Sequence, residues 1–461
     1  MKTFLKASFL AASLLAGTSA FATGSDSSAV AGQWDAVLTR NGIEIPFRLD
    51  IKADGQGVQG IFYDGFKPYD GTTSASFEDG NLVLNVDHYL TTINAKLENG
   101  QLNGDVVAQN RETSANYAFR AKRHVDAPPS SVQAPQIAGN WEIPLSTPSS
   151  KGEKAFHFIV QQKGAEVAAS ILRIDGDTGS YTGAFKDGKW VLSHFDGGRP
   201  GVIVVTPKPD GTLEVAQQVE RPGVATTTAV ADKPANNSEY ATQTTPDGRY
   251  AKTLVAYRTE VARARGFAEP DDSLKHTTVN NPDETFKFAF PDNDGNIVTN
   301  EDPRFKGKVV VAVVTGTWCP NCHDEAQYLV KLDKQYRGKD LAIVALNFEE
   351  PEQQETLKRQ KAFVKQYGIE YTYLQAGSPA QLWEKVPQLA HLDTWPATVF
   401  VGRDGKVKAV HSGFASPASG DFHKQLQRDF ISRIDTLLAE KVTTAAAETT
   451  TAQPGKVLAA R

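Results

Sequence analysis

The sequence predicts a multidomain protein in which two antiparallel β units precede an α/β unit. Its 461 residues exceed what a single hydrophobic core usually holds. Two stretches of about 85 residues repeat each other in order and spacing, each with short alternating runs between Asn-Gly and Asp-Gly turns. After residue 277 the pattern changes to buried β-branched runs alternating with helical periods, which indicates a sheet covered by helices.

Overall composition describes an ordinary globular protein. Hydrophobic residues make up 40% of the chain, charged residues make up 22%, and the formal net charge is −5. Such a chain lacks the basic patch that attracts nucleic acid or an anionic membrane, so we expect neither as a partner. Past the N-terminal segment, no stretch approaches the roughly 20 apolar residues that cross a bilayer as a helix.

The N-terminal segment, residues 1–22, reads as a secretory signal peptide. Lys2 and Lys6 precede a short apolar run, which ends in the small-x-small pattern Ala20-Phe21-Ala22. The run is too short to favour an uncleaved anchor, and no cysteine follows it to carry a lipid. We therefore expect the mature chain to begin at Thr23 in a bacterial periplasm.

The two β units open with the same short pattern. Residues 29–124 form the first unit and residues 136–220 the second, and each begins with a Gly-x-Trp sequence ending at Trp34 or Trp141. This opening resembles the first strand of lipocalin-like barrels, so we predict for each unit a sandwich or a barrel of that kind. A Trp that plugs one end of a small β core is favoured over a ligand-binding calyx.

Residues 221–276 separate the β units from the α/β unit. Their first part is rich in Thr, Ala, Pro and Asn, which predicts a linker. Ala251–Gly266 has a helical period and is expected to form a short helix. At the other end of the chain, residues 441–461 are rich in Thr and Ala and predict a disordered tail.

The α/β unit spans residues 277–440. Val309–Val314 and Leu341–Phe348 are apolar runs that predict buried strands. Glu352–Tyr367 is amphipathic and predicts one helix, and Ala397–His411 predicts a hairpin across an Asp-Gly turn.

The chain holds two cysteines, Cys319 and Cys322, at the point where a predicted buried strand turns into a helix. The unpaired N–H groups and the positive dipole end of a helix start stabilise an anion, so the Cys319 thiol should ionise more easily than a free thiol. Two intervening residues allow the Cys322 sulfur to reach the first one. The pair therefore predicts thiol–disulfide exchange.

Two other interpretations of the pair are weaker. A structural disulfide between Cys319 and Cys322 would close too short a loop to constrain the unfolded chain. A zinc site would need two more ligands, and His323 is the one candidate nearby. We predict a redox-active disulfide, with no metal and no other cofactor.

The order strand, C-x-x-C helix, strand, helix, x-Pro, hairpin and closing helix is that of a thioredoxin fold. Together with Thr394-Trp395-Pro396, it resembles the exported thioredoxins called TlpA, ResA or CcmG in bacteria. The resemblance covers about residues 277–440. It implies a thiol–disulfide oxidoreductase in which Cys319 is the nucleophile, Cys322 resolves the mixed disulfide, and Pro396 is a cis-proline facing the sulfurs.

Glu325 follows Cys322 by three residues and carries a further expectation. Cytoplasmic thioredoxins have a buried Asp six residues before the first cysteine, and Val313 occupies that place here. In the TlpA/ResA branch a Glu at the position of Glu325 accepts the proton of the second cysteine. The alternative is a first-turn Glu placed for the helix dipole.

For substrate binding, we expect Trp318, Pro320, Trp395 and Pro396 to contribute. Trp395 is bulkier than the small or β-branched residue common before the cis-proline, and it narrows the expected groove. The Pro-Asn dipeptide between the cysteines tunes the reduction potential in a direction that the sequence leaves open. By resemblance, the partners are disulfide-bearing proteins and a membrane electron donor of the DsbD/CcdA type.

These observations predict a periplasmic thiol–disulfide oxidoreductase that reduces substrate disulfides. Two alternatives stay open at this point. One is an envelope binding or scaffold protein in which the thioredoxin domain is accessory, and the other is an oxidase that donates disulfides.

Overall fold

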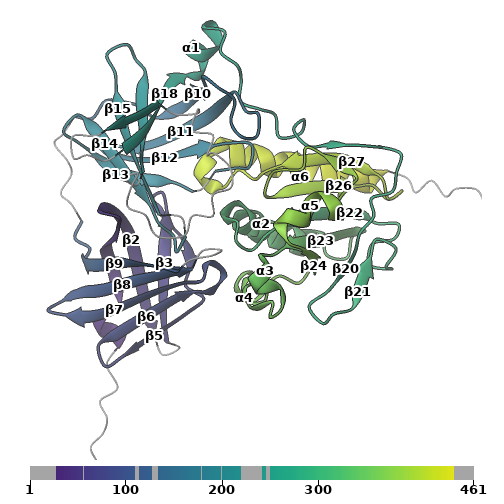
Figure 1. The fold of residues 1–461 in the computed structure, drawn as a ribbon, viewed down its shortest axis with the longest axis horizontal. Coiled ribbons are helices and arrows are strands. Elements are labelled where there is room, and N and C mark those ends of the chain that lie inside the picture. The colour runs from purple at the N-terminus through teal and green to yellow at the C-terminus, as the bar shows by residue number, and fades with distance from the viewer. Residues whose placement is uncertain are drawn as a thin grey trace, which may run out of the picture.

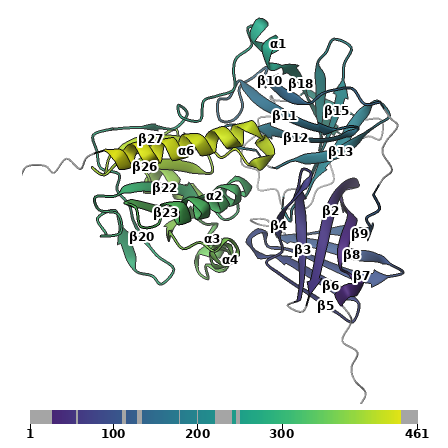
Figure 2. The same cartoon turned by 180° about the vertical axis from the view of Figure 1, so that it is seen from behind.

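The computed structural model shows two β units next to an α/β unit (Figures 1 and 2). The described residues are 27–54, 57–109, 114–126, 133–177, 179–198, 200–219, 241–244 and 250–440. The predicted signal peptide (1–22), the predicted tail (441–461) and residues 221–240 of the predicted linker lie outside them. The predicted fold class is confirmed, since two antiparallel β units precede an α/β unit.

The first β unit is a nine-stranded antiparallel meander that curls into a barrel. Its strands are β1 (Gly32–Arg40), β2 (Ile43–Asp54), β3 (Gly57–Asp64), β4 (Lys67–Gly71), β5 (Ser74–Glu78), β6 (Asn81–Val86), β7 (Thr91–Glu98), β8 (Gln101–Gln109) and β9 (Ser114–Arg123). Strand β1 pairs with both β2 and β9, which brings the two ends of the meander together. Strands β4 and β5 are the edges and do not pair with each other, so the barrel is open there. Two 3₁₀ turns, η1 (Ser27–Ala29) and η2 (Asp87–Tyr89), complete the unit.

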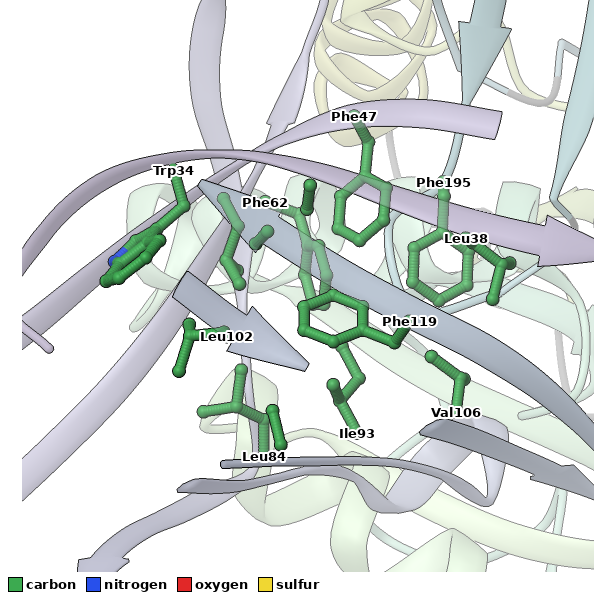
Figure 3. Packing of buried hydrophobic residues seen from close by; sticks show 14 of the residues in the cluster. Trp34, Leu38, Phe47, Phe62, Leu84, Ile93, Leu102, Val106, Phe119 and Phe195 are labelled. Atoms are coloured by element: carbon green, nitrogen blue, oxygen red, sulfur yellow. The ribbon is translucent and has the colours of Figure 1, made fainter. Parts of the chain in front are cut away.

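The core of this unit follows from the alternation of its strands. Trp34, Ala36 and Leu38 of β1 point inward and are buried, because successive side chains of a strand face opposite sides. Figure 3 shows the aromatic part of the core, where Phe47 lies next to Phe195, at a ring-centroid distance of 4.8 Å. Phe195 belongs to the second β unit. The two β units therefore share part of one hydrophobic core.

The second β unit is a closed antiparallel barrel. Its strands are β10 (Gly139–Pro144), β11 (Ala155–Lys163), β12 (Glu166–Leu172), β13 (Tyr181–Lys186), β14 (Lys189–His194), β15 (Gly201–Pro207), β16 (Leu213–Val219), β17 (Ala241–Thr244) and β18 (Tyr250–Arg258). Pairing of β10 with the end of β18 closes the barrel, and β17 pairs with the start of β18. Of the two predicted architectures, the structure has the barrel.

Each β unit has the same Trp–Arg pair, formed by the Trp of its Gly-x-Trp opening and an Arg of its last strand. The Trp34 indole donates to the carbonyl oxygen of Val30 at 2.8 Å, and the Arg123 guanidinium stacks 4.1 Å from the ring centroid. In the second unit the Trp141 indole donates to Ile137 at 2.8 Å, and Arg258 stacks at 4.0 Å. Cation–π contact and burial together explain why the Gly-x-Trp opening recurs.

Strand β18 corrects the prediction of a helix at Ala251–Gly266. Residues 250–258 are strand, and helix α1 covers only Thr259–Ala264. Leu254 and Ala256 are buried while Val255 is exposed, which is the alternation of a half-buried strand. Strand β18 pairs with both β10 and β16. This tertiary pairing outweighs the local helical period of the segment. The second β unit therefore extends beyond residue 220.

The α/β unit is built on a five-stranded sheet with the order β24-β23-β22-β26-β27. Its main elements are β22 (Val309–Thr315), α2 (Pro320–Tyr336), β23 (Leu341–Phe348), α3 (Pro351–Gln354), α4 (Lys358–Tyr367), β24 (Thr372–Gly377), α5 (Leu382–Lys385), β26 (Ala397–Val401), β27 (Val407–Ser412) and α6 (Asp421–Ala439). The small elements are β19 (Thr278–Val279), β20 (Ala289–Pro291), β21 (Ile297–Thr299), η4 (Pro379–Gln381), β25 (Leu389–Ala390) and η5 (Pro417–Ser419). The helix expected over Glu352–Tyr367 is divided into α3 and α4, because Leu357 adopts a left-handed conformation with φ 51°.

Strand β22 forms the centre of this unit, and all of its residues are buried. Val311 packs in the same cluster as Leu329 of α2 and Phe430 of α6. Ala312 belongs to a second cluster on the opposite face of the sheet. Burial on both faces explains the continuous apolar run in the sequence. Among the described residues, no helix has the length and apolarity to cross a membrane.

Candidate active site

The two cysteines lie where β22 passes into α2, as predicted. Cys319 is the N-cap residue of α2 and has an extended backbone, and Pro320 is the first residue of the helix. The backbone N–H of Cys322 donates to the carbonyl oxygen of Cys319 at 3.0 Å, so one helical turn holds both sulfurs on the same side. The structure shows the pair as two thiols, with Cys319 3% and Cys322 1% exposed.

The segment before β26 provides the second side of the site. The Trp395–Pro396 peptide bond is cis, as the resemblance implies. The Cys319 thiol donates a hydrogen bond to the carbonyl oxygen of Trp395 at 3.3 Å. A backbone carbonyl thus lies directly beside the proposed nucleophile, although 76 residues separate the two in sequence.

Two tryptophans border the sulfurs. The rings of Trp318 and Trp395 meet edge to face with centroids 5.1 Å apart, and both side chains are half-buried. The Trp318 indole donates to the carbonyl oxygen of Phe348 at 2.9 Å, which fixes its orientation. Pro320, in contrast, is buried and faces residues of the first β unit, such as Tyr69. The expectation that Pro320 contacts substrate is therefore corrected, because the docked β unit covers it.

Glu325 is buried inside α2, with 1% of its surface exposed. The Thr398 hydroxyl of β26 donates to one carboxylate oxygen, and the other oxygen has no hydrogen-bond partner among the described residues. Burial raises the pKa of Glu325 to about 8, the Thr398 hydrogen bond opposes this rise, and the charge of Cys319 adds to it. This environment disfavours the alternative of an exposed Glu serving the helix dipole.

Cys322 is the second group with a shifted acidity. Burial raises the pKa of its thiol well above 9, and the hydrogen bond with Cys319 raises it further. A buried thiol with a raised pKa needs a base before it can attack as a thiolate. Glu325 lies three residues further along α2 as a buried carboxyl with a raised pKa, on which the charge of Cys319 acts.

A buried ionic network that the sequence reasoning missed supports the loop before Cys319. The Thr317 hydroxyl donates to Glu349, and Arg359 donates to Glu349 at 3.1 Å and to Glu350 at 2.6 Å. Arg359 is 4% exposed and Glu349 is fully buried, so one guanidinium serves two carboxyls away from water, and burial raises the pKa of Glu349. The signal that could have revealed the network is the pair of glutamates directly after a buried strand.

His323, the one residue considered for zinc, has other contacts. Its Nε2 lies 2.7 Å from the carbonyl oxygen of Thr317, and its Nδ1 lies 2.8 Å from the Tyr367 hydroxyl. The ring stacks on Tyr89 of the first β unit at a centroid distance of 4.7 Å. His323 therefore joins the active-site helix to α4 and to the first β unit.

The α/β unit has three features of a thioredoxin-type domain. These are its strand order, a C-x-x-C pair at the start of α2 and a cis-proline beside that pair. Residues 277–426 match the family model described as Redoxin. The chain is 30% identical over 122 residues to the thiol-disulfide oxidoreductase ResA of Bacillus thuringiensis subsp. konkukian, covering 26% of this chain and 62% of that protein. It is 33% identical over 88 residues to the thiol:disulfide interchange protein DsbE of Escherichia coli, covering 19% of this chain and 45% of that protein.

Among solved structures, a DsbF homologue from Corynebacterium diphtheriae matches with 21% identity and a TM-score of 0.28, covering 37% of this chain and 98% of that one. The chain spans 62% of the length of the first ResA relative, and the Redoxin match lies in the C-terminal part of this chain. The Redoxin match and the ResA relatives show a thioredoxin-superfamily domain similar to ResA in the C-terminal part of the chain, which confirms the predicted resemblance.

Proposed function

We propose that this protein is a thiol–disulfide oxidoreductase that reduces disulfides of exported proteins. The observation that carries the proposal is the dithiol at the start of α2, with the Cys319 sulfur 3.3 Å from the Trp395 carbonyl oxygen. A buried carboxyl with a raised pKa lies on the same helix. Its similarity to ResA and DsbE supports the same class of reaction.

The reaction proceeds by two thiolate attacks. The Cys319 thiolate attacks one sulfur of the substrate disulfide, a mixed disulfide forms, and the first substrate thiolate leaves. Cys322 then loses its proton to Glu325 and attacks the Cys319 sulfur. The mixed disulfide breaks, the Cys319–Cys322 disulfide forms, and the second substrate thiol leaves. Two electrons pass from the dithiol to the substrate.

The remaining parts of the proposal concern binding and regeneration. Trp318 and Trp395 supply an apolar rim beside the sulfur, and the Trp395 backbone offers a hydrogen-bonding edge to an extended substrate segment.

A membrane electron donor of the DsbD/CcdA type returns the Cys319–Cys322 disulfide to the dithiol. The predicted signal peptide and the resemblance to the exported TlpA/ResA branch support a periplasmic location.

The reduction potential of the Cys319–Cys322 pair tests the direction of transfer. A potential near or below about −220 mV supports a reductant, whereas one near about −120 mV identifies a disulfide-donating oxidase. A disulfide-reductase assay with Cys319→Ser tests the enzyme itself. Activity that survives this substitution would contradict the proposal.

A second candidate function, ligand binding by the β units, is favoured by one observation. A cleft of about 770 Å³ lies between the two units and falls in the size range of small-molecule sites at domain interfaces. Phe47 and Phe66 give it apolar walls. Its charged lining has more cations than carboxyls: Arg48, Arg120, Lys122 and Lys163 against Asp35 and Glu166. An anion with an apolar body fits this lining.

Fluorescence of 1-anilinonaphthalene-8-sulfonate, an apolar aromatic anion, measures this binding directly. We expect Arg48→Glu combined with Lys163→Glu to weaken binding about tenfold, while the same charge change at Lys186 and Lys189, outside the cleft, leaves it unchanged. Equal binding by both double variants would rule out the cleft as an anion site.

A further inference from the structure

The loop between β12 and β13, residues 173–177, lies against the redox site. Its Asp175 carbonyl oxygen accepts two hydrogen bonds, from the backbone N–H of Phe414 at 3.1 Å and from the side-chain amide of Asn321 at 3.0 Å. Asn321 stands between the two cysteines. Phe414 follows Gly413, whose N–H donates to the carbonyl oxygen of Pro396 at 2.8 Å. The 173–177 loop therefore bridges the cysteine segment and the segment beside the cis-proline.

A buried carboxylate anchors this loop. Asp177 is 0% exposed and accepts from the Ser416 N–H at 3.0 Å, from the Ser416 hydroxyl at 2.5 Å and from the Ser419 hydroxyl. Burial of a carboxylate is tolerated only where donors satisfy it, and both of these serines belong to the α/β unit. Asp175 also pairs with Lys151. The loop is thus fixed to the α/β unit by specific donors.

The two backbones approach too closely for side chains to come between them. Gly176 has φ +114°, and a Cβ atom there would collide with the carbonyl oxygen of Phe414. A Cβ atom on Gly413 would likewise collide with the carbonyl oxygen of Ile174. Both positions need glycine for the contact itself as well as for the positive φ.

The first β unit covers the neighbouring side of the same helix start. The Tyr89 ring stacks on His323, the Tyr69 hydroxyl donates to Asp324, and the Tyr367 hydroxyl donates to Asp70 at 2.8 Å. Figure 1 shows α2 on the side of the α/β unit that faces both β units.

As a result, the start of α2 is enclosed. Asn321 is 4% and His323 is 2% exposed, and Pro320 is buried as well. Trp318 and Trp395, by contrast, remain half-buried. Cys319 itself is 3% exposed, so the half-buried Trp318 and Trp395 form the side from which its sulfur can be approached, and the side toward the β units is closed.

We propose that the β units select the substrates of the redox site, with the 173–177 loop as a fixed wall. Cys319 is reached over Trp318 and Trp395, by a small disulfide or by a disulfide in one extended chain segment. A disulfide on the surface of a folded protein is excluded, because such a surface collides with the wall. This inference rests on the proposed reductase function and names its substrate class.

Gly176→Ala tests the wall with a substitution that lies outside the α/β unit. The new methyl group displaces the loop from Phe414, so the ratio of kcat/KM for folded insulin to kcat/KM for bis(2-hydroxyethyl) disulfide should rise about tenfold. Gly188→Ala is the matched control. Gly188 has φ +79° in the β13–β14 turn, and a Cβ atom there meets nothing within 4 Å. The control shares the backbone strain but leaves the ratio unchanged.

Asp177→Ala provides a second way to release the loop, by removing the acceptor for Ser416 and Ser419. Circular dichroism melting identifies the variants that fold, and the ratio is compared for those. An unchanged ratio in a folded Gly176→Ala or Asp177→Ala variant overturns the inference, and so does an equal change for both substrates. Inactivity of the unmodified protein toward the small disulfide instead contradicts the reductase function.

Discussion

Glu325→Gln replaces a carboxyl that the fold holds at 1% exposure beside the reactive dithiol. The ordinary pKa of this side chain is 4.5, and burial raises it to about 8 in the folded protein. Between these two values the folded protein keeps a proton that the unfolded chain has released. Glutamine has a similar shape and does not titrate, so the substitution isolates the effect of ionisation.

The size of the effect follows from the two pKa values. Because the folded pKa is raised, the stabilising contribution of the neutral acid is fully present below the unfolded pKa of 4.5 and is lost as the pH rises through about 8. The gap is about 3.5 pH units at about 1.4 kcal/mol each, so it amounts to about 5 kcal/mol. The free energy of unfolding of Glu325→Gln, relative to the unmodified protein, should rise by about this amount between pH 4.5 and pH 8.5.

Urea unfolding followed by tryptophan fluorescence, under reducing conditions at several pH values, measures this difference. Glu352→Gln, an exposed position on α3, is the control and should follow the unmodified protein at every pH. In the same buffers, the rate at which the mixed disulfide resolves should rise through about pH 8 as the carboxylate forms. Glu325→Gln should lose this rise and resolve about a hundredfold more slowly. A stability difference that does not change with pH would refute the buried-acid reasoning.

Three further substitutions test the site and its support. Cys322→Ser should leave Cys319 joined to substrate, and mass spectrometry of the trapped mixed disulfide checks this; a freely released substrate would contradict the resolving role. Trp395→Ala should raise the KM for a disulfide-bridged peptide about tenfold, because part of the apolar rim is lost; steady-state kinetics with an unchanged KM would count against the rim. Arg359→Met should lower the free energy of unfolding by about 3–5 kcal/mol, because Glu349 loses its buried partner, and urea titration measures the loss.

Sequence reasoning located the redox centre because its signals are local. Two residues separate Cys319 from Cys322 in the sequence, so one helical turn suffices to bring the sulfurs together. The run of buried residues in β22 marks the strand that comes before them. The Gly-x-Trp openings likewise identified both β units, since each Trp is buried in its own unit and bonds to a carbonyl four residues earlier.

The same reasoning failed where a segment depends on distant partners. Strand β18 carries a helical period, yet β10 and β16 bind it on both sides, and one of these partners precedes it by more than a hundred residues. Pro320 was expected at the substrate surface, but the docked first β unit covers it. The local sequence pattern predicts neither outcome, because the contacts that decide both of them come from distant parts of the chain.

The sequence alone determined the chemistry: a dithiol at a helix start, a carboxyl one turn further on, and a proline-bearing segment that resembles the exported thioredoxins. Tertiary structure decided how that chemistry is enclosed. The amide of Asn321 meets the carbonyl of Asp175 across 146 residues, and Asp177 meets Ser416 across 239. Residue types and short spacings specify local geometry, whereas contacts between units depend on how whole folded surfaces fit together.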